Sequence, residues 1–236
     1  MSDGLISALE IAVADARGQD APLAARLLFV ADAVRALSTD FAEAVDTFVA
    51  RLQSAGAGEN TPQVGDIMPD FMLSDQDGRM VTLEQLLETG PAVISFHRGH
   101  WCPYCRLTMA GMAEIEGRIA PHALVAISPE RQKYTRALRA EAGATFPFLS
   151  DVGSGYALTL GLAVWVDDTM ADMIERAGWT IPDYQGTAGW IMPIPAVFVV
   201  GKDARIIARF VDADYRKRME LEEILGVLKA FADKPG

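Results

Sequence analysis

Positive charge is scarce in this sequence. There are 21 lysine and arginine residues against 32 aspartate and glutamate residues, which gives a formal net charge of −11 at pH 7. Proteins that bind nucleic acid need clustered basic side chains to neutralise phosphates, and an anionic membrane surface repels an acidic protein. The composition therefore argues against both a nucleic-acid partner and a membrane partner.

Long apolar runs are also missing. No stretch approaches the ~18 uninterrupted apolar residues that indicate a membrane-spanning helix. The first residues carry Asp3 and Glu10 and lack a basic region followed by an apolar stretch, so they do not resemble a signal peptide. We therefore expect a soluble, cytoplasmic protein.

Cysteine is rare: Cys102 and Cys105 are the only two in 236 residues. In a reducing compartment, so small a number serves redox or metal chemistry more often than it holds a fold together. Apolar residues, in contrast, are abundant, because 50% of the chain is hydrophobic and 22% is charged. This composition can bury a full core and suits one elaborated domain or one domain with a satellite.

The N-terminal part of the chain has a helical pattern. Apolar residues recur at spacings of four, three and four on one helical face: Phe41, Val45, Phe48 and Leu52. Ser38 offers a capping group just before this face, and earlier helices are predicted over residues 5–16 and 22–37. We predict an N-terminal helical extension over residues 1–57, with a role in packing or in a homodimer.

Strand and helix signals alternate after a glycine-rich linker at residues 54–66. Apolar runs at 92–97 and 123–128 flank a helical pattern at 103–118, which predicts two parallel strands joined by a helix. The fold class predicted for residues 58–236 is α/β, with a central mixed sheet flanked by helices.

Three later segments complete this prediction. Residues 130–143 predict a helix that stops at Gly143, residues 196–211 a β-hairpin around 201–204, and residues 219–234 a closing amphipathic helix. The segment 163–192 resembles an insertion, and it holds three of the four tryptophans: Trp165, Trp179 and Trp190. These aromatic residues either form a lid over a substrate pocket or belong to the core.

The two cysteines follow the strand predicted at 92–97. Cys102 directly precedes Pro103, a residue favoured in the first turn of a helix. As the capping residue, Cys102 can accept from the backbone N–H of Tyr104 or Cys105, and the positive end of the helix favours its thiolate. Cys105 lies one turn further into the helix, close enough to attack an oxidised Cys102. These positions predict Cys102 as the nucleophile and Cys105 as the resolving thiol.

A metal site is the alternative use of these residues. His97, His100, Cys102 and Cys105 form a compact set, and zinc accepts two cysteines with two histidines. Structural zinc sites usually separate their two ligand pairs more widely, and a histidine in a strand has its direction fixed by the sheet. We therefore predict no metal and no cofactor, with His97 a hydrogen-bonded residue near the strand end and His100 a solvated loop residue.

The motif WCPYC behind an apolar strand resembles the active-site entry of the thioredoxin fold. The segment from VGDIMPDF to WCPYC, together with LVAISPE, FPFLSDVGSGYALTLGL and IPAVFVVGKDARI, resembles peroxiredoxin-like proteins of the alkyl hydroperoxide reductase and thiol-specific antioxidant family. The similarity covers about residues 64–232. It implies a thioredoxin-like domain over residues 58–236 and a thiol-dependent antioxidant activity.

The resemblance also implies roles for single residues. In the thioredoxin superfamily a cis-proline faces the active-site cysteines, and Pro195 matches its position. The peroxiredoxin loop P-x-x-x-T-x-x-C places Cys105 at the reactive cysteine, Cys102 at the threonine and Arg98 at the proline, while the distant arginine of that family falls at about Pro195. This alignment nominates Cys105 as the nucleophile, whereas the thioredoxin alignment and the capping argument nominate Cys102, which we adopt. Arg98 or Arg106 could supply positive charge near the thiolate.

The sequence is compatible with three functions. The preferred one is a thiol peroxidase that reduces hydrogen peroxide or organic hydroperoxides and is recycled by a thioredoxin-like donor. The others are a protein thiol–disulfide reductase and a binding module that retained the fold. The candidate site consists of the redox pair Cys102 and Cys105 with five supporting residues: Arg98, Trp101, Pro103, Tyr104 and Pro195. The charged segment 210–220, which contains Arg218, is predicted to be a solvated face with local ion pairs.

Overall fold

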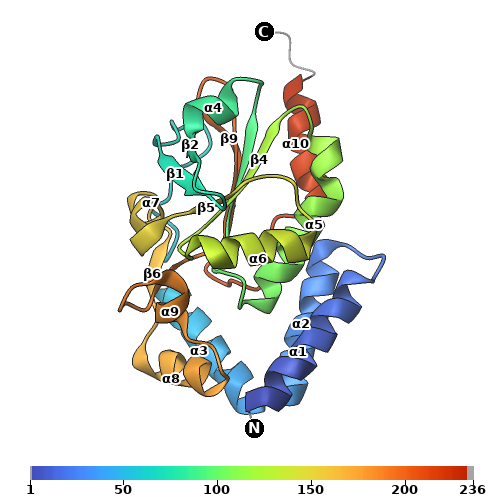
Figure 1. The fold of residues 1–236 in the computed structure, drawn as a ribbon, viewed down its shortest axis with the longest axis vertical. Coiled ribbons are helices and arrows are strands. Elements are labelled where there is room, and N and C mark those ends of the chain that lie inside the picture. The colour runs from blue at the N-terminus through green and yellow to red at the C-terminus, as the bar shows by residue number, and fades with distance from the viewer. Residues whose placement is uncertain (1, 233–236) are drawn as a thin grey trace.

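The computed structural model describes residues 2–232, with side chains from Ile6 onward. A seven-stranded sheet with the strand order β2-β1-β5-β4-β3-β8-β9 forms the centre of the molecule (Figure 1). Its strands are β1 (Met72–Asp75), β2 (Met80–Thr82), β3 (Ala92–Phe96), β4 (Ala123–Ser128), β5 (Phe148–Ser150), β8 (Ala196–Val200) and β9 (Ile206–Val211). β3, β4 and β5 are parallel, whereas the other pairs are antiparallel. The predicted mixed sheet is confirmed.

The central strands are covered on both faces. Successive residues of a strand point to opposite sides of a sheet, so Val93 of β3 and Leu124 of β4 belong to one hydrophobic core, while Ile94 and Val125 belong to the other. Because neither face meets solvent, β3 is buried along its whole length.

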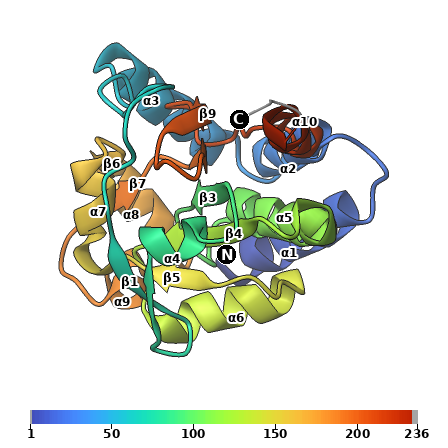
Figure 2. The same ribbon diagram turned by 90° about the horizontal axis from the view of Figure 1, so that it is seen from above.

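Ten α-helices surround this sheet in the described part of the chain (Figures 1 and 2). They are α1 (Ser2–Arg17), α2 (Leu23–Leu37), α3 (Thr39–Ser54), α4 (Leu83–Leu87), α5 (Pro103–Ile119), α6 (Gln132–Ala142), α7 (Gly155–Thr159), α8 (Asp168–Arg176), α9 (Ile181–Gln185) and α10 (Leu221–Ala232). A short 3₁₀ turn, Val152–Ser154, precedes α7. Within residues 2–232, none of these helices is long and apolar enough to cross a membrane.

Several helix ends form as their residues predict. The Ser38 side chain accepts from the N–H of Phe41 and caps α3, and Gly143 ends α6 in the left-handed conformation, with φ of 73°. α10 confirms the closing helix, although residues 233–234 of the predicted span lie outside the described residues.

The N-terminal helices pack against the rest of the molecule. α1 and α2 contact each other and α5, and α3 contacts α8 (Figure 1). Residues of these helices, such as Leu27 and Phe48, share one hydrophobic core with Leu107 of α5. The three predicted helices are present, while the division at residue 57 and a role in a homodimer stay predictions.

The segment predicted as an insertion is closed by a two-stranded ribbon. β6 (Ala163–Trp165) pairs antiparallel with β7 (Ile191–Pro193), and α8 and α9 lie between them in the sequence. Arg51 of α3 contacts this segment through the Asp167 carboxylate, at 3.2 Å, and the Trp165 carbonyl. The insertion is therefore fastened to the N-terminal helices.

Candidate active site

The two cysteines lie where β3 leads into α5. Cys102 is the residue before the helix, and Pro103 is its first residue. Both thiols are free, and both residues are buried, with exposed fractions of 1% for Cys102 and 0% for Cys105. The predicted position of the pair at a helix start is confirmed.

The capping role predicted for Cys102 is wrong. Its backbone is extended, as in a capping residue, but its side chain accepts no hydrogen bond from the helix. The residue instead lines a small, mostly apolar pocket. Burial, followed by the effect of the adjacent Cys105, raises the pKa of the Cys102 thiol well above its ordinary value. Cys102 is therefore a protonated thiol at neutral pH.

Cys105 has the environment of a thiolate. Its sulfur accepts the backbone N–H of Arg98 at 3.4 Å and lies 3.6 Å from Nη2 of Arg218. Burial opposes ionisation, but the neighbouring Cys102 thiol and the charges of Arg218 and Arg98 outweigh it and lower the pKa of Cys105 to about 5. The charge distribution thus favours Cys105 as the nucleophile, as the peroxiredoxin alignment does, over Cys102, which we adopted from the sequence.

Arg98 lies beside the pair, as predicted. Its guanidinium stacks over Trp101, at 4.7 Å from the ring centre, and over Tyr215, at 3.8 Å. Nε donates to the Met192 sulfur at 3.1 Å, whereas Nη1 is buried and has no hydrogen-bond partner among the described residues. A buried, unpaired donor beside a thiol is available to an oxygen of a substrate.

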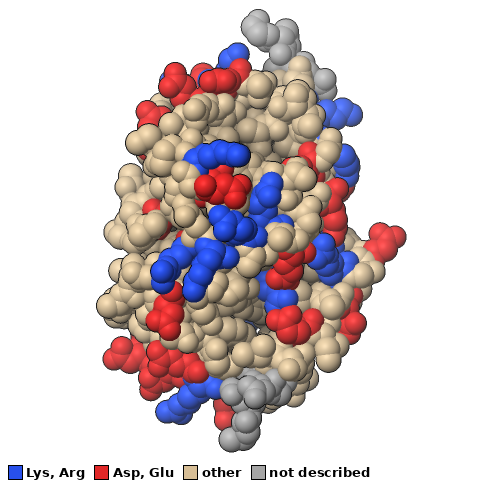
Figure 3. Space-filling model, viewed as in Figure 1, with Lys and Arg blue, Asp and Glu red and all other residues tan. Residues whose placement is uncertain are grey.

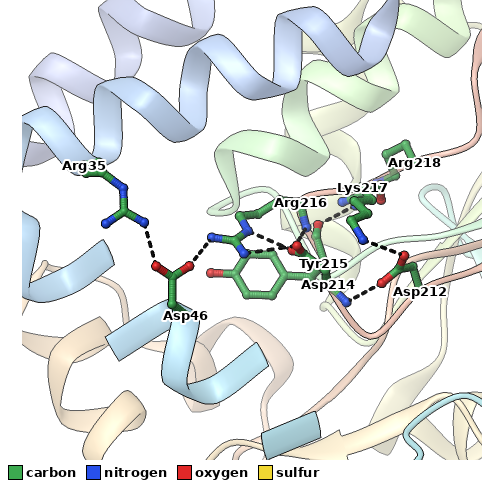
Figure 4. Close-up of polar contacts among 8 residues, drawn as sticks. All are labelled: Arg35, Asp46, Asp212, Asp214, Tyr215, Arg216, Lys217 and Arg218. Carbon is green, nitrogen blue, oxygen red and sulfur yellow. Dashed lines mark hydrogen bonds and ion pairs between the residues drawn. The ribbon is translucent and has the colours of Figure 1, made fainter. Parts of the chain in front are cut away.

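Arg218 is the site residue that sequence reasoning missed. Only 7% of it is exposed, and its Nη1 donates to the backbone carbonyls of Tyr215 and Lys217 while Nη2 faces Cys105. The solvated face predicted for residues 210–220 is therefore wrong for Arg218, although its neighbours do form ion pairs (Figure 4). No local pattern distinguishes Arg218, since its burial depends on the packing of this segment against α5.

Arg106 does not reach the thiols. It forms ion pairs with Glu10 of α1, at 2.5 Å, and with Glu141 of α6, at 2.7 Å. The positive charge near Cys105 comes from Arg98 and Arg218.

Pro195 differs from its predicted role. Among the described residues the only cis peptide bond precedes Pro121, so the bond before Pro195 is trans. Ile194 is bound through its N–H to the Leu162 carbonyl, 2.8 Å away, and the ordinary preference of proline bonds for trans applies. Pro195 is buried at the start of β8 but does not line the pocket at Cys102. The cis-proline prediction is wrong.

The two histidines also differ from their predictions. His97 is buried, and neither ring nitrogen has a hydrogen-bond partner among the described residues. Burial, aided by Arg218 and His100, lowers its pKa to about 3. His100 is only partly exposed, and its Nδ1 lies 2.6 Å from the buried Glu130 carboxylate. Glu130 also accepts the backbone N–H of His100 at 2.7 Å. The prediction of a hydrogen-bonded His97 and a solvated His100 is therefore wrong.

Glu130 clamps the turn that leads to Cys102. Gly99 has φ of 144°, and a Cβ on it would lie 2.5 Å from the Glu130 carboxyl carbon. Only glycine combines this conformation with so close an approach. The turn is therefore fixed from the end of β4 as well as from β3.

The N-terminal helices and the insertion cover the cysteines. Cys102 lines a pocket of about 30 Å³, to which helices α1, α2, α3 and α8 contribute Leu9, Val34, Phe41, Val45, Met170 and Ile174. Pro103, Tyr104 and Trp101 line the same pocket, so these predicted site residues do meet at the thiol. A cavity of about 490 Å³ shares Val34, Val45 and Tyr104 with it. The extension thus forms a wall of the site.

An ion-pair network holds this cover in place (Figure 4). Asp46 of α3 contacts Arg35 of α2 at 2.6 Å and Arg216 at 2.7 Å, and Arg216 also binds Asp214 at 2.8 Å. The hydrogen bonds from Arg216 and then Arg35 lower the pKa of Asp46. The network links two N-terminal helices to the segment that carries Arg218.

Asp46→Ala is expected to make the buried thiols more accessible, because it removes the contact of α3 with both arginines. We expect alkylation of the reduced protein by N-ethylmaleimide to become several-fold faster, measured by mass spectrometry at pH 7. Asp203→Ala is the matched control, since it removes an exposed carboxylate whose one ion-pair partner within the described residues is Arg205. Equal alkylation rates in Asp46→Ala and the wild type would show that this network does not hold the cover closed.

Comparisons with known proteins identify the family and the fold of this chain. The AhpC/TSA family model matches residues 64–209. No curated protein sequence matches the chain. Peroxidoxin BcpB from Mycobacterium tuberculosis is 21% identical with a TM-score of 0.56, and the match covers 71% of this chain and 97% of that one. AhpC from M. tuberculosis is 16% identical with a TM-score of 0.54, covering 73% and 94%.

A third similar structure is reduced Prx3 in complex with H₂O₂ from Vibrio vulnificus, which is 15% identical with a TM-score of 0.55 and covers 71% of this chain and 99% of that one. At these identities the structures establish the shared thioredoxin-type fold. The family match spans more than half of the chain and contains both cysteines, whereas α1–α3 lie outside it. The chain belongs to the AhpC/TSA family and is a thiol peroxidase or thiol oxidoreductase.

Proposed function

We propose that this protein is a thiol peroxidase in which Cys105 attacks the hydroperoxide and Cys102 resolves the product. The observation that carries the proposal is the surroundings of the buried Cys105 sulfur, which accepts the Arg98 N–H at 3.4 Å and lies 3.6 Å from the Arg218 guanidinium. These groups favour the thiolate and lower the pKa of Cys105. A buried thiolate between two cationic side chains is suited to a neutral substrate that develops negative charge as it reacts.

The proposed cycle has three steps. The Cys105 thiolate attacks one peroxide oxygen, the O–O bond breaks, and the departing hydroxide or alkoxide takes up a proton to give water or an alcohol. Cys105 is now a sulfenic acid, which the Cys102 thiol attacks to form a disulfide and release water. A thioredoxin-like donor then supplies two electrons and two protons and restores both thiols.

The size of the pocket at Cys102 favours a small peroxide. A cavity needs about 10–15 Å³ to hold one water, so a pocket of about 30 Å³ matches the two oxygens of hydrogen peroxide. Arg98 lines this pocket and has an unpaired Nη1 to bind one of those oxygens. Organic hydroperoxides would have to enter through the larger cavity behind Tyr104.

Protein thiol–disulfide reduction is the second candidate. The C-x-x-C spacing at the start of α5, with both thiols free, favours it. The cover argues against it, because a disulfide on a folded protein cannot reach a thiol that is 1% exposed unless α3 or α8 moves. We therefore rank the peroxidase first.

Stopped-flow fluorescence tests the proposal. Reduced protein is mixed with hydrogen peroxide, and Trp101, which lies against Arg98, reports the reaction. We expect oxidation orders of magnitude faster than that of free cysteine at the same pH. Oxidation at the rate of free cysteine, together with rapid reduction of a protein disulfide, would instead support the reductase.

A further inference from the structure

A basic surface stands out on this acidic protein. In Figure 3 lysine and arginine side chains gather at the middle of the face that α6 occupies in Figure 1. The basic face consists of Arg79, Arg131, Lys133, Arg136 and Arg139, which lie on the β1–β2 turn and on or next to α6. The hydrogen bond from Gln76, followed by the charges of Arg136, Arg79 and Arg139, lowers the pKa of the Asp77 carboxyl. The face therefore carries a clear positive excess within a chain of net charge −11.

Some of these basic side chains have an internal partner and others have none among the described residues. Arg136 pairs with Asp77 at 3.5 Å, and Arg139 donates to the Phe146 carbonyl. Arg79, Arg131 and Lys133 are exposed, and none of them forms an ion pair with a carboxylate of the described residues. Exposed cations without an internal partner can pair with charges on another molecule at little cost.

The basic face borders the redox turn. Lys133 lies 4.5 Å from the ring centre of Tyr134, and Tyr134 stacks on His100 with ring centres 4.6 Å apart. His100 is two residues before Cys102, and it lines a cavity of about 270 Å³ together with Trp101 and Pro103. The basic face is therefore connected to the turn that carries Cys102 through Tyr134 and His100.

We propose that the basic face is the docking surface for a small acidic dithiol protein that reduces the Cys102–Cys105 disulfide. The inference rests on the proposed function, which requires such a donor. At a net charge of −11 the rest of the molecule repels an acidic protein, so charge complementarity directs it to this face. A nucleic acid is disfavoured, because its charge extends beyond the patch onto acidic surface.

Docking here assigns the direction of the reductive step. As for any protein partner, α3 or α8 must first move to uncover Cys102, which is 1% exposed. A donor thiolate then attacks the Cys102 sulfur, the bond to Cys105 breaks, and Cys105 leaves as the thiolate that Arg218 and the Arg98 N–H stabilise. The thiol of lower pKa is the better leaving group. The second donor thiol then attacks the mixed disulfide, so that the donor becomes a disulfide and Cys102 departs and takes up a proton.

Charge reversal tests this surface. The oxidised protein is mixed with reduced thioredoxin in a stopped-flow instrument, for the wild type, for Arg131→Glu combined with Lys133→Glu, and for Lys202→Glu combined with Lys229→Glu. The last pair makes the same charge change at two exposed lysines outside the face. We expect the first variant to be reduced at least about tenfold more slowly at low salt, with the difference shrinking as salt rises, and the control to match the wild type.

Dithiothreitol, a small uncharged reductant, separates docking from damage to the site. The ratio of the thioredoxin rate to the dithiothreitol rate should fall only in the Arg131/Lys133 variant. Equal ratios in all three proteins, or a wild type that thioredoxin does not reduce, would overturn the docking proposal. Failure of the proposed peroxidase function is a different result, namely slow oxidation of the reduced wild type by hydrogen peroxide.

Discussion

Replacing Cys105 with serine is expected to abolish rapid oxidation by hydrogen peroxide, whereas Cys102→Ser should keep the first oxidation step and stop at a sulfenic acid. Cys105 is the thiol whose pKa is lowered, and Cys102 is the one whose pKa is raised. Without Cys102, no neighbouring thiol can attack the sulfenic acid. Stopped-flow oxidation measures the first effect, and dimedone labelling with mass spectrometry locates the second.

The two variants control for each other, because each removes one sulfur from the same helix turn with a near-isosteric change. Both should retain the wild-type circular dichroism spectrum, since serine is smaller than cysteine and the Cys102 side chain makes no capping hydrogen bond to α5. A dimedone adduct on Cys102 in the Cys105→Ser protein, formed as fast as hydrogen peroxide oxidises the wild type, would reverse the assignment and restore the order that the sequence suggested.

Local patterns predicted most of the fold. The apolar run at 123–128 coincides with β4, and the helix predicted at 103–118 is α5 (Pro103–Ile119). Periodicity and capping act over a few residues, so they can be seen in the sequence alone. Ser38 caps α3 because its oxygen is close to the N–H of Phe41 whatever packs around it.

The chemistry of the site was less predictable, because burial and distant residues determine it. Capping and the helix dipole are local and favoured a Cys102 thiolate, but the sulfur lies in a pocket built by the N-terminal helices and by α8 of the insertion. The charge that stabilises Cys105 comes from Arg218, 113 residues away in the chain. Unpaired His97 and the trans bond before Pro195 are likewise results of tertiary packing.

The family alignment gave information that local physics could not. It places Cys105 at the reactive position, and in the structure the Arg98 N–H and the Arg218 guanidinium lie around that sulfur. It also leaves the family's distant arginine without a counterpart, since that position falls at about Pro195. Arg218, from the segment between β9 and α10, lies close enough to Cys105 to take over the role.

The Arg218→Met variant tests whether Arg218 replaces the family's distant arginine, because methionine keeps a long side chain and removes the charge. The pKa of Cys105 should rise by about 1–3 units from its value of about 5. The thiolate exists above its pKa and is lost as pH falls through it, so the wild type should lose alkylation reactivity near pH 5 and the variant at a correspondingly higher pH. The pH dependence of iodoacetamide alkylation measures the pKa of Cys105 in the wild type and in the variant.

In Arg218→Met, the rate of oxidation by hydrogen peroxide should fall by more than the changed ionisation of Cys105 explains. Above pH 9 Cys105 is a thiolate in both proteins, yet Arg218 would also stabilise the negative charge that develops on the departing oxygen, so we expect oxidation by hydrogen peroxide to stay about 10–100-fold slower in the variant. Arg118→Met removes an exposed guanidinium from the far end of α5, the helix that carries Cys105. It should leave the pH profiles of alkylation and of oxidation unchanged. Arg218→Lys should recover part of the lost rate, because it restores the charge. If Arg218→Met oxidised like the wild type at every pH, the thiolate of Cys105 would owe its reactivity to Arg98 alone.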